Sequence, residues 1–218
     1  SSGQQPIIGG DQTAPTAPAI DLNNGGAITG TAEAGSTVSV SYPDAAGGTV
    51  TVSTTANASG EWTVAAPSPA LSNGAEITAT ATDAAGNTGP AGSTTVDTLA
   101  PNTSASSISI DPIAGDNIVN ATEAKGTVTL SGTLNNLASD AATTTVLVSV
   151  NGVSYTATVD ASTGKWTVDV AGSELALATQ INVTANVTDA AGNTASFNQT
   201  GSYSVDTVAP DAQIGRAH

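Results

Sequence analysis

The chain has 218 residues, of which 18 are acidic and 3 are basic, and its formal net charge is −15. A negative field of this size repels nucleic acids and anionic membranes, so neither is expected as a partner. Cysteine and methionine are absent and only 3% of residues are aromatic, which excludes disulfides and cysteine nucleophiles and favours an all-β fold built from small side chains.

The same landmarks occur twice along the chain, in the same order. Three stretches of the form Asp-x-x-Ala-Pro recur, beginning at Asp11, Asp97 and Asp206. Between them lie a tryptophan segment, SGEWTV at 59–64 and TGKWTV at 163–168, and then an acidic turn, TDAAGN at 82–87 and 188–193. Repeats of this kind indicate copies of one structural unit. We expect two domains, at 11–97 and 98–206, with 1–10 and 207–218 as linkers or expression remnants.

Strand signals fill both repeats. Residues 37–41 and 127–131 alternate polar and apolar side chains, as strands with one solvated face do. Turn sequences separate such stretches, at 32–36, 44–48, 57–60 and 151–152. About seven short strands per hundred residues predict an immunoglobulin-like β-sandwich, and hence two tandem sandwiches in an extended array. Trp62 and Trp166 could form sugar-stacking platforms, but in a chain with so few large side chains we assign them to the cores.

The topology of a seven-strand sandwich predicts which acidic residues meet. Successive strands alternate in direction, so the turn between the sixth and seventh strands lies at the pole where its domain begins. Each acidic hairpin should therefore meet the boundary aspartate that precedes its own domain: Asp83 and Asn87 with Asp11, and Asp189 and Asn193 with Asp97.

The connection between the first two strands lies at the opposite pole. In the second repeat it carries five side chains with oxygen donors, Asp111, Asp116, Asn117, Asn120 and Glu123, which we expect near Asp206. The shorter counterpart at 21–26 retains Asp21, Asn23 and Asn24 but lacks the later acids, so a site there is in doubt.

Calcium is the metal that these residues suit. Carboxylate and amide oxygens at turns can supply its six to eight ligands, whereas zinc or copper would require His or Cys. The loop from Asp111 lacks the ligand spacing of an EF-hand. An alternative is that these Asp and Asn residues only satisfy backbone donors in their own turns.

The boundary sequences, the TDAAGN hairpins and DPIAGDNIVNATEA at 111–124 resemble the bacterial immunoglobulin-like repeats of giant RTX-type adhesins. These are the extender domains that hold a cell-surface adhesin away from the membrane. The resemblance implies an extracellular structural spacer in which Ca²⁺ at domain junctions stabilises the domains and makes the array rigid. It implies neighbouring domains of the same polypeptide as partners, without direct membrane contact, in a monomer.

Two other classes of function compete with the spacer. An enzyme is disfavoured because the only histidine is the last residue and no serine has a basic partner. A ligand-binding adhesin domain that contacts a sugar, a protein or ice remains the alternative, although Tyr42, Tyr155 and Tyr203 are scattered in the sequence. No apolar stretch approaches the length of a membrane span and no signal peptide is visible, so we expect a soluble fragment or mature product.

Overall fold

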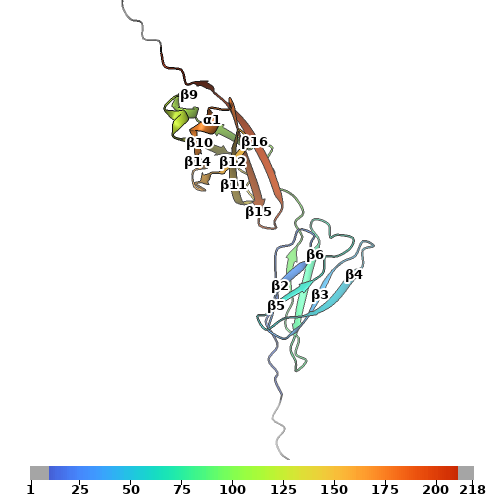
Figure 1. Ribbon diagram of the computed structural model, residues 1–218. Helices are drawn as coiled ribbons and strands as arrows, with labels where there is room; N and C mark the ends of the chain where they lie inside the picture. Colours follow the sequence, from blue (N-terminus) through green and yellow to red (C-terminus); the bar gives the residue numbers. More distant parts are fainter. Residues whose placement is uncertain (1–9, 211–218) are drawn as a thin grey trace, which may run out of the picture. The chain divides into compact units, whose positions relative to one another are not determined.

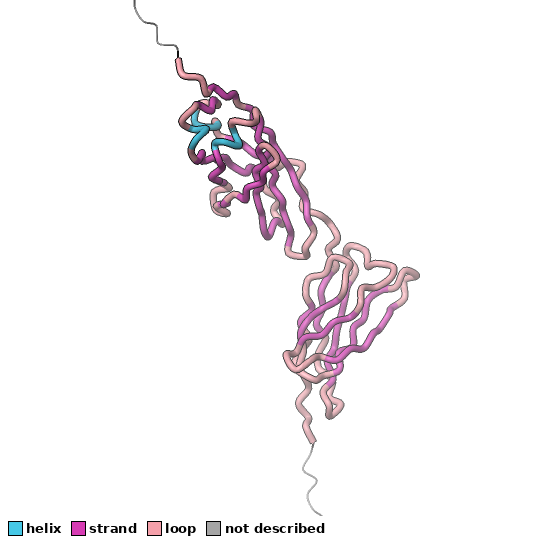
Figure 2. The backbone as a smooth tube through the Cα atoms, in the orientation of Figure 1, coloured by secondary structure: helices cyan, strands magenta, loops and turns pink. Residues whose placement is uncertain are grey.

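The computed structural model describes residues 10–210, so most of both flanking segments lies outside the described residues. Contacts divide the chain into two compact units. The first comprises the chain up to Leu99 together with Ala191–Asn193, and the second comprises Ala100–Ala190 and the chain from Thr194 onwards. Strands and connecting loops make up nearly all of both units (Figures 1 and 2).

The described part of the first unit contains seven strands in two antiparallel sheets. They are β1 (Ala19–Ile20), β2 (Ile28–Thr31), β3 (Thr37–Pro43), β4 (Thr49–Thr55), β5 (Glu61–Val64), β6 (Glu76–Thr82) and β7 (Gly92–Thr95). One sheet has the order β1-β2-β5 and the other β4-β3-β6-β7. This is the predicted immunoglobulin-like arrangement.

Alternation of side chains builds the core of this unit. In β3, Val38 and Val40 are fully buried while Thr37 faces solvent, as the period-two pattern predicted. Val38 and Val40 pack with Ile28, Trp62 and other apolar side chains of both sheets. Trp62 is 3% exposed, which confirms its assignment to the core.

The second unit repeats the sandwich with longer strands and additional elements. Its elements are β8 (Ser107–Ile110), η1 (Ile113–Gly115), β9 (Ile118–Asn120), η2 (Glu123–Lys125), β10 (Thr127–Asn135), β11 (Ala141–Val150), β12 (Val153–Thr156), β13 (Thr158–Val159), β14 (Lys165–Ala171), α1 (Gly172–Leu175), β15 (Gln180–Asp189), β16 (Thr194–Ser202) and β17 (Ser204–Asp206). The sheets are β13-β14-β10-β8, β12-β11-β15-β16 and the parallel pair β17-β9. Trp166 is fully buried in this core, again as predicted.

Each tryptophan packs on a glycine of the neighbouring strand. Gly30 is the register partner of Trp62 in β2 and β5, and Gly132 is the partner of Trp166 in β10 and β14. A Cβ added to either glycine would lie 2.5 Å from Cζ2 of its tryptophan and would also collide with a main-chain oxygen. The glycines are therefore required by close packing of the indole ring.

Four elements of the second unit were not expected from the sequence. The connection at 111–126 folds into η1, β9 and η2, and the short helix α1 follows β14. Gly172 allows α1 to pack against η2, because a Cβ there would collide with the carbonyl oxygen of Glu123. The parallel pairing of β17 with β9 then places Asp206 opposite Asn120.

Candidate metal centre

The turn at 83–87 is closed by its own aspartate. The Asp83 amide donates to the carbonyl oxygen of Asn87 over 3.0 Å, and Gly86, at φ 91°, makes the tight reversal possible. Asp83 Oδ1 accepts from the Asn87 amide at 2.8 Å, and Oδ2 accepts from Asn87 Nδ2 at 2.9 Å. These bonds, the Asn87 side chain foremost, hold the pKa of Asp83 below its ordinary value of 3.8.

A second turn in the same unit shows which part of this geometry is general. The sequence DAAGG at 44–48 has the same main-chain bond between its first and fifth residues, at 2.9 Å, and Asp44 Oδ1 accepts from the Gly48 amide at 2.7 Å. An aspartate that starts such a turn thus has a local capping role whether or not a domain boundary is near. What distinguishes 83–87 is its fifth residue, Asn87 in place of glycine.

The Asn87 side chain reaches the boundary aspartate. Its Nδ2 donates to the carbonyl oxygen of Asp11 at 2.9 Å, and the Asp11 side chain is within hydrogen-bonding range of Asp83. The segment after Asp11 can pack closely here because Gly89 and Gly92 have no side chain. A Cβ on Gly89 would collide with the carbonyl oxygen of Pro15, and a Cβ on Gly92 with that of Pro18. The structure thus brings together Asp11, Asp83 and Asn87, as the topology predicted.

The next boundary has the same contact. Asn193 groups with the first unit, and its Nδ2 donates to the carbonyl oxygen of Asp97 at 2.8 Å. The Asp97 amide in turn donates to the carbonyl oxygen of Asn23 at 2.9 Å. Asp189, the first residue of this hairpin, is 5% exposed, whereas Asp83 is half-buried. Asn23 was noted in the sequence only as part of a doubtful site, and the structure uses its side chain within the 23–27 loop.

Asp111 has a structural role at the end of strand β8. Its amide donates to the Ser131 carbonyl at 2.9 Å, and its Oδ2 accepts from the Ser131 hydroxyl at 2.6 Å. Asp21 makes the same pair of bonds with Thr29 in the first unit, where the later acids are absent. Because the first unit makes the same bonds without the later acids, we interpret them as fixing the end of the strand against its neighbour.

The remaining polar residues of this connection also cap nearby backbone. Asp116 Oδ1 accepts from the Ile118 amide, and Asn117 Oδ1 accepts from the Ile113 amide. Asn120 and Glu123 cap each other, with each side chain accepting from the other's amide at 2.9 Å. These contacts favour turn stabilisation as the main role of the loop.

The oxygen atoms around Asp11 and Asp83 have the chemistry of calcium ligands. The carboxylates of Asp11 and Asp83 and the nearby carbonyl oxygens are the hard ligands that Ca²⁺ prefers. Asn87, however, directs Nδ2 at these oxygens, so its amide would have to present Oδ1 instead to act as a ligand. Within residues 10–210, no three acidic or histidine side chains are grouped closely enough to hold a metal ion. Main-chain and amide oxygens would have to complete such a site.

Comparisons with known proteins agree with the fold. A family model described as the bacterial Ig domain matches residues 14–98. The structure of a Ca²⁺-stabilised adhesin that helps an Antarctic bacterium reach out and bind ice is 37% identical, over 92% of this chain and 51% of that one, with a TM-score of 0.54. A structure from a 1.5-MDa bacterial ice-binding adhesin, concerned with host cell surface retention, is 32% identical, over 90% of this chain and 67% of that one, with a TM-score of 0.50. The chain belongs to the bacterial immunoglobulin-like domains of large adhesins.

This membership confirms the resemblance seen in the sequence. An immunoglobulin-like domain from the M. primoryensis ice-binding adhesin is 42% identical, over 46% of this chain and 96% of that one, with a TM-score of 0.42. The chain spans about half the length of the Antarctic structure, 51% of it. No curated protein matches the chain. Among residues 10–210, no helix has the length and apolar character needed to cross a membrane.

Proposed function

We propose that this immunoglobulin-like pair is a structural extender of a bacterial cell-surface adhesin, acting outside the cell and without catalytic activity. Its domains are 11–97 and 98–206, and its partners are neighbouring domains of the same polypeptide. Calcium at the domain boundaries stabilises the sandwiches and restricts their relative orientation. A kinship with large adhesins supports the adhesin role, and one relative is described as Ca²⁺-stabilised.

The observation that carries the proposal is the repeated contact between hairpin asparagine and boundary aspartate. Asn87 on Asp11 and Asn193 on Asp97 make the same bond to a main-chain oxygen. The turn at 44–48, which lies at no boundary, has glycine where the boundary hairpins have asparagine. The asparagine therefore serves the boundary and is not needed for the turn itself.

At the first boundary, the carboxylates of Asp11 and Asp83 lie within hydrogen-bonding range of each other, and two ionised carboxylates at that range repel. Asp11 lies beside Asp83, and the first unit contains no basic side chain to neutralise them. A bound divalent cation would supply that neutralising charge and would link the two segments that provide its ligands. Short linkers usually leave neighbouring domains free to swivel, so such a link would limit the motion.

The test compares melting and extension with and without calcium. Free calcium at about a hundred times its dissociation constant stabilises by about 2.7 kcal/mol per site. For a domain of about a hundred residues this corresponds to a melting temperature higher by about 10–20 °C. We expect calorimetry to show that rise in millimolar calcium relative to chelator. Under the same conditions, small-angle scattering should show a narrower spread of molecular dimensions.

Matched variants separate the boundary from ordinary turns. The double variant Asp97→Asn with Asp189→Asn removes two candidate ligand charges and should lose the share of the calcium response that comes from the Asp97 boundary, while the site at Asp11 and Asp83 should keep its own share. Asp44→Asn changes the equivalent turn residue away from the boundary and should keep the full response. The calcium proposal would be overturned if neither the melting temperature nor the maximum dimension changed with calcium, or if the double variant responded as fully as the parent.

A further inference from the structure

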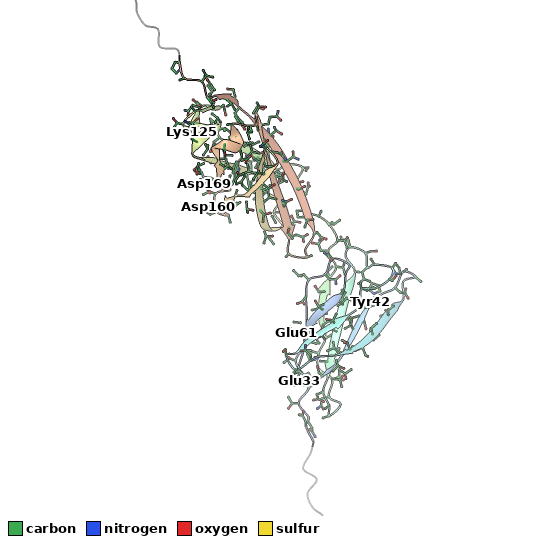
Figure 3. All side chains as sticks on the ribbon, in the orientation of Figure 1. Glu33, Tyr42, Glu61, Lys125, Asp160 and Asp169 are labelled. Atoms are coloured by element: carbon green, nitrogen blue, oxygen red, sulfur yellow. The ribbon has the colours of Figure 1, made fainter. Side chains whose placement is uncertain are left out.

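A groove opens in the first unit between the β3–β4 hairpin and the connection that follows β5. Its volume is about 710 Å³, within the range of about 300–1,000 Å³ typical of small-molecule sites. One wall is formed by Tyr42, Pro43 and Val50, and the other by residues 67–75. Tyr42, labelled in Figure 3, lies near the turn of this hairpin and is half-buried against the core.

The corresponding hairpin and connection of the second unit are tied together by polar contacts. Asn151, in the β11–β12 turn, donates from Nδ2 to Glu174 Oε2 of α1 at 2.8 Å. The hydroxyl of Tyr155, on β12, accepts from the Ala171 amide at 3.4 Å, where α1 begins. In the first unit, within residues 10–210, the Tyr42 hydroxyl has no hydrogen-bond partner. The groove is therefore a property of the first unit that the shared fold does not require.

The lining combines apolar surface with hydroxyl and amide groups. Tyr42, Pro67 and Pro69 offer flat apolar surface, and Leu71 closes the floor as a buried core residue. The hydroxyls of Ser68 and Ser72 and the amide of Asn73 lie among them. Asn73 Oδ1 already accepts from the Thr98 amide at 2.9 Å, which leaves its Nδ2 as a donor.

Charge narrows the class of ligand. The basic side chains in the sequence are Lys125, Lys165 and Arg216, all outside the first unit, so an anionic ligand would find no counter-charge there. Asp44 is the one carboxylate in the lining, and its Oδ1 already accepts two amide hydrogens of its own turn. A cationic ligand would thus find a single carboxylate, which already accepts hydrogen bonds within its own turn. An uncharged ligand with many hydroxyls and an apolar face matches the lining best.

We propose that the groove between the β3–β4 hairpin and residues 67–75 binds a neutral saccharide. The C–H face of a sugar ring packs on Tyr42 and the prolines, and its hydroxyls exchange hydrogen bonds with the tyrosine hydroxyl, Asn73 and Ser72. The binding function is separate from the spacer role, since the groove contains none of the boundary residues Asp11, Asp83 or Asn87.

The experiment probes the intact chain with neutral and acidic saccharides in calcium buffer. Immobilised neutral and acidic glycans are screened first, and the corresponding free mono- and disaccharides are then titrated by ¹H–¹⁵N NMR. We expect neutral sugars to bind and to shift the amide signals of residues 42–50 and 67–75. Binding in both arms indicates recognition of the sugar itself, and binding only of immobilised forms indicates recognition of a glycan in its linked context.

Two variants test the location. Ala70→Trp fills the groove from an exposed position and should weaken binding at least tenfold, whereas Ala58→Trp, in the exposed turn between β4 and β5, should leave it unchanged. Tyr42→Phe removes only the hydroxyl and should weaken binding severalfold even if the tryptophan variant fails to fold. The proposal is overturned if no neutral saccharide binds, if only acidic glycans bind, or if Ala70→Trp and Tyr42→Phe bind as the parent does.

Discussion

Replacing Gly132 by alanine should destabilise the second unit alone. The added Cβ would lie 2.5 Å from Cζ2 and 2.7 Å from Cε2 of Trp166 and would collide with the carbonyl oxygen of Ser109. Trp166 is fully buried, and the carbonyl belongs to a strand paired with β10, so neither neighbour can withdraw without disturbing the sheet. Since Gly132 has no left-handed φ, the cost arises from packing and not from backbone strain.

The magnitude follows from that overlap. Overpacking a well-filled core costs about 1–3 kcal/mol, and a rigid carbonyl together with an indole places this site at the upper end. A small gain in strand preference of alanine over glycine offsets about 0.5–1 kcal/mol. A net loss of about 2 kcal/mol lowers the melting temperature of a unit of this size by about 8–16 °C.

Scanning calorimetry of the intact chain measures the effect unit by unit. Gly132→Ala should shift the transition of the second unit, and Gly30→Ala, which meets Trp62 in the same way, should shift that of the first. Gly126→Ala is the matched control, because the nearest atom to its new Cβ is 3.8 Å away. A Gly132→Ala chain that melts like the parent would refute the packing argument, and equal shifts of both transitions would refute independent domains at 11–97 and 98–206.

Three further outcomes follow from single side chains. Asn87→Ala should raise the pKa of Asp83 towards 3.8, because the largest stabilising bond to its carboxylate is lost; carboxyl ¹³C titration measures this, and an unchanged pKa would contradict the hydrogen-bond assignment. Burial raises the pKa of Tyr203 above 10.0, so the stability it contributes is present below pH 10 and lost as pH rises through the higher folded value. Tyr203→Phe should cost about 1 kcal/mol through loss of the bond to the Leu175 carbonyl and should remove this alkaline loss in denaturant titrations; an alkaline loss that persists points to another group. Asn151→Ala should speed amide exchange in α1 while changing global stability by less than about 1 kcal/mol, and unchanged exchange would show that the hairpin does not restrain the helix.

The sequence was sufficient to predict the class of fold and the meeting of hairpin and boundary. Alternation in β3 and β10 reports which face of a strand is buried, and strand direction in a sandwich is fixed by connectivity. That is why Asn87 could be expected beside Asp11 from the order of the motifs, and the bond between them agrees. The tryptophans could be assigned to the cores because so few other large side chains are available.

Tertiary structure decided what each polar residue does. Asp44 and Asp83 begin turns of the same local geometry, and only the contact of Asn87 with a residue distant in sequence separates a boundary hairpin from an ordinary one. Asp111 is a candidate metal ligand by its place in the sequence, and only the structure shows that its carboxylate accepts a hydrogen bond from the Ser131 hydroxyl on the neighbouring strand. Carboxylates can cap backbone, accept hydroxyls or bind cations, and composition alone does not distinguish these uses. The groove beside Tyr42 likewise depends on how far a hairpin stands from a loop, a distance set by packing across the sandwich and absent from any local pattern.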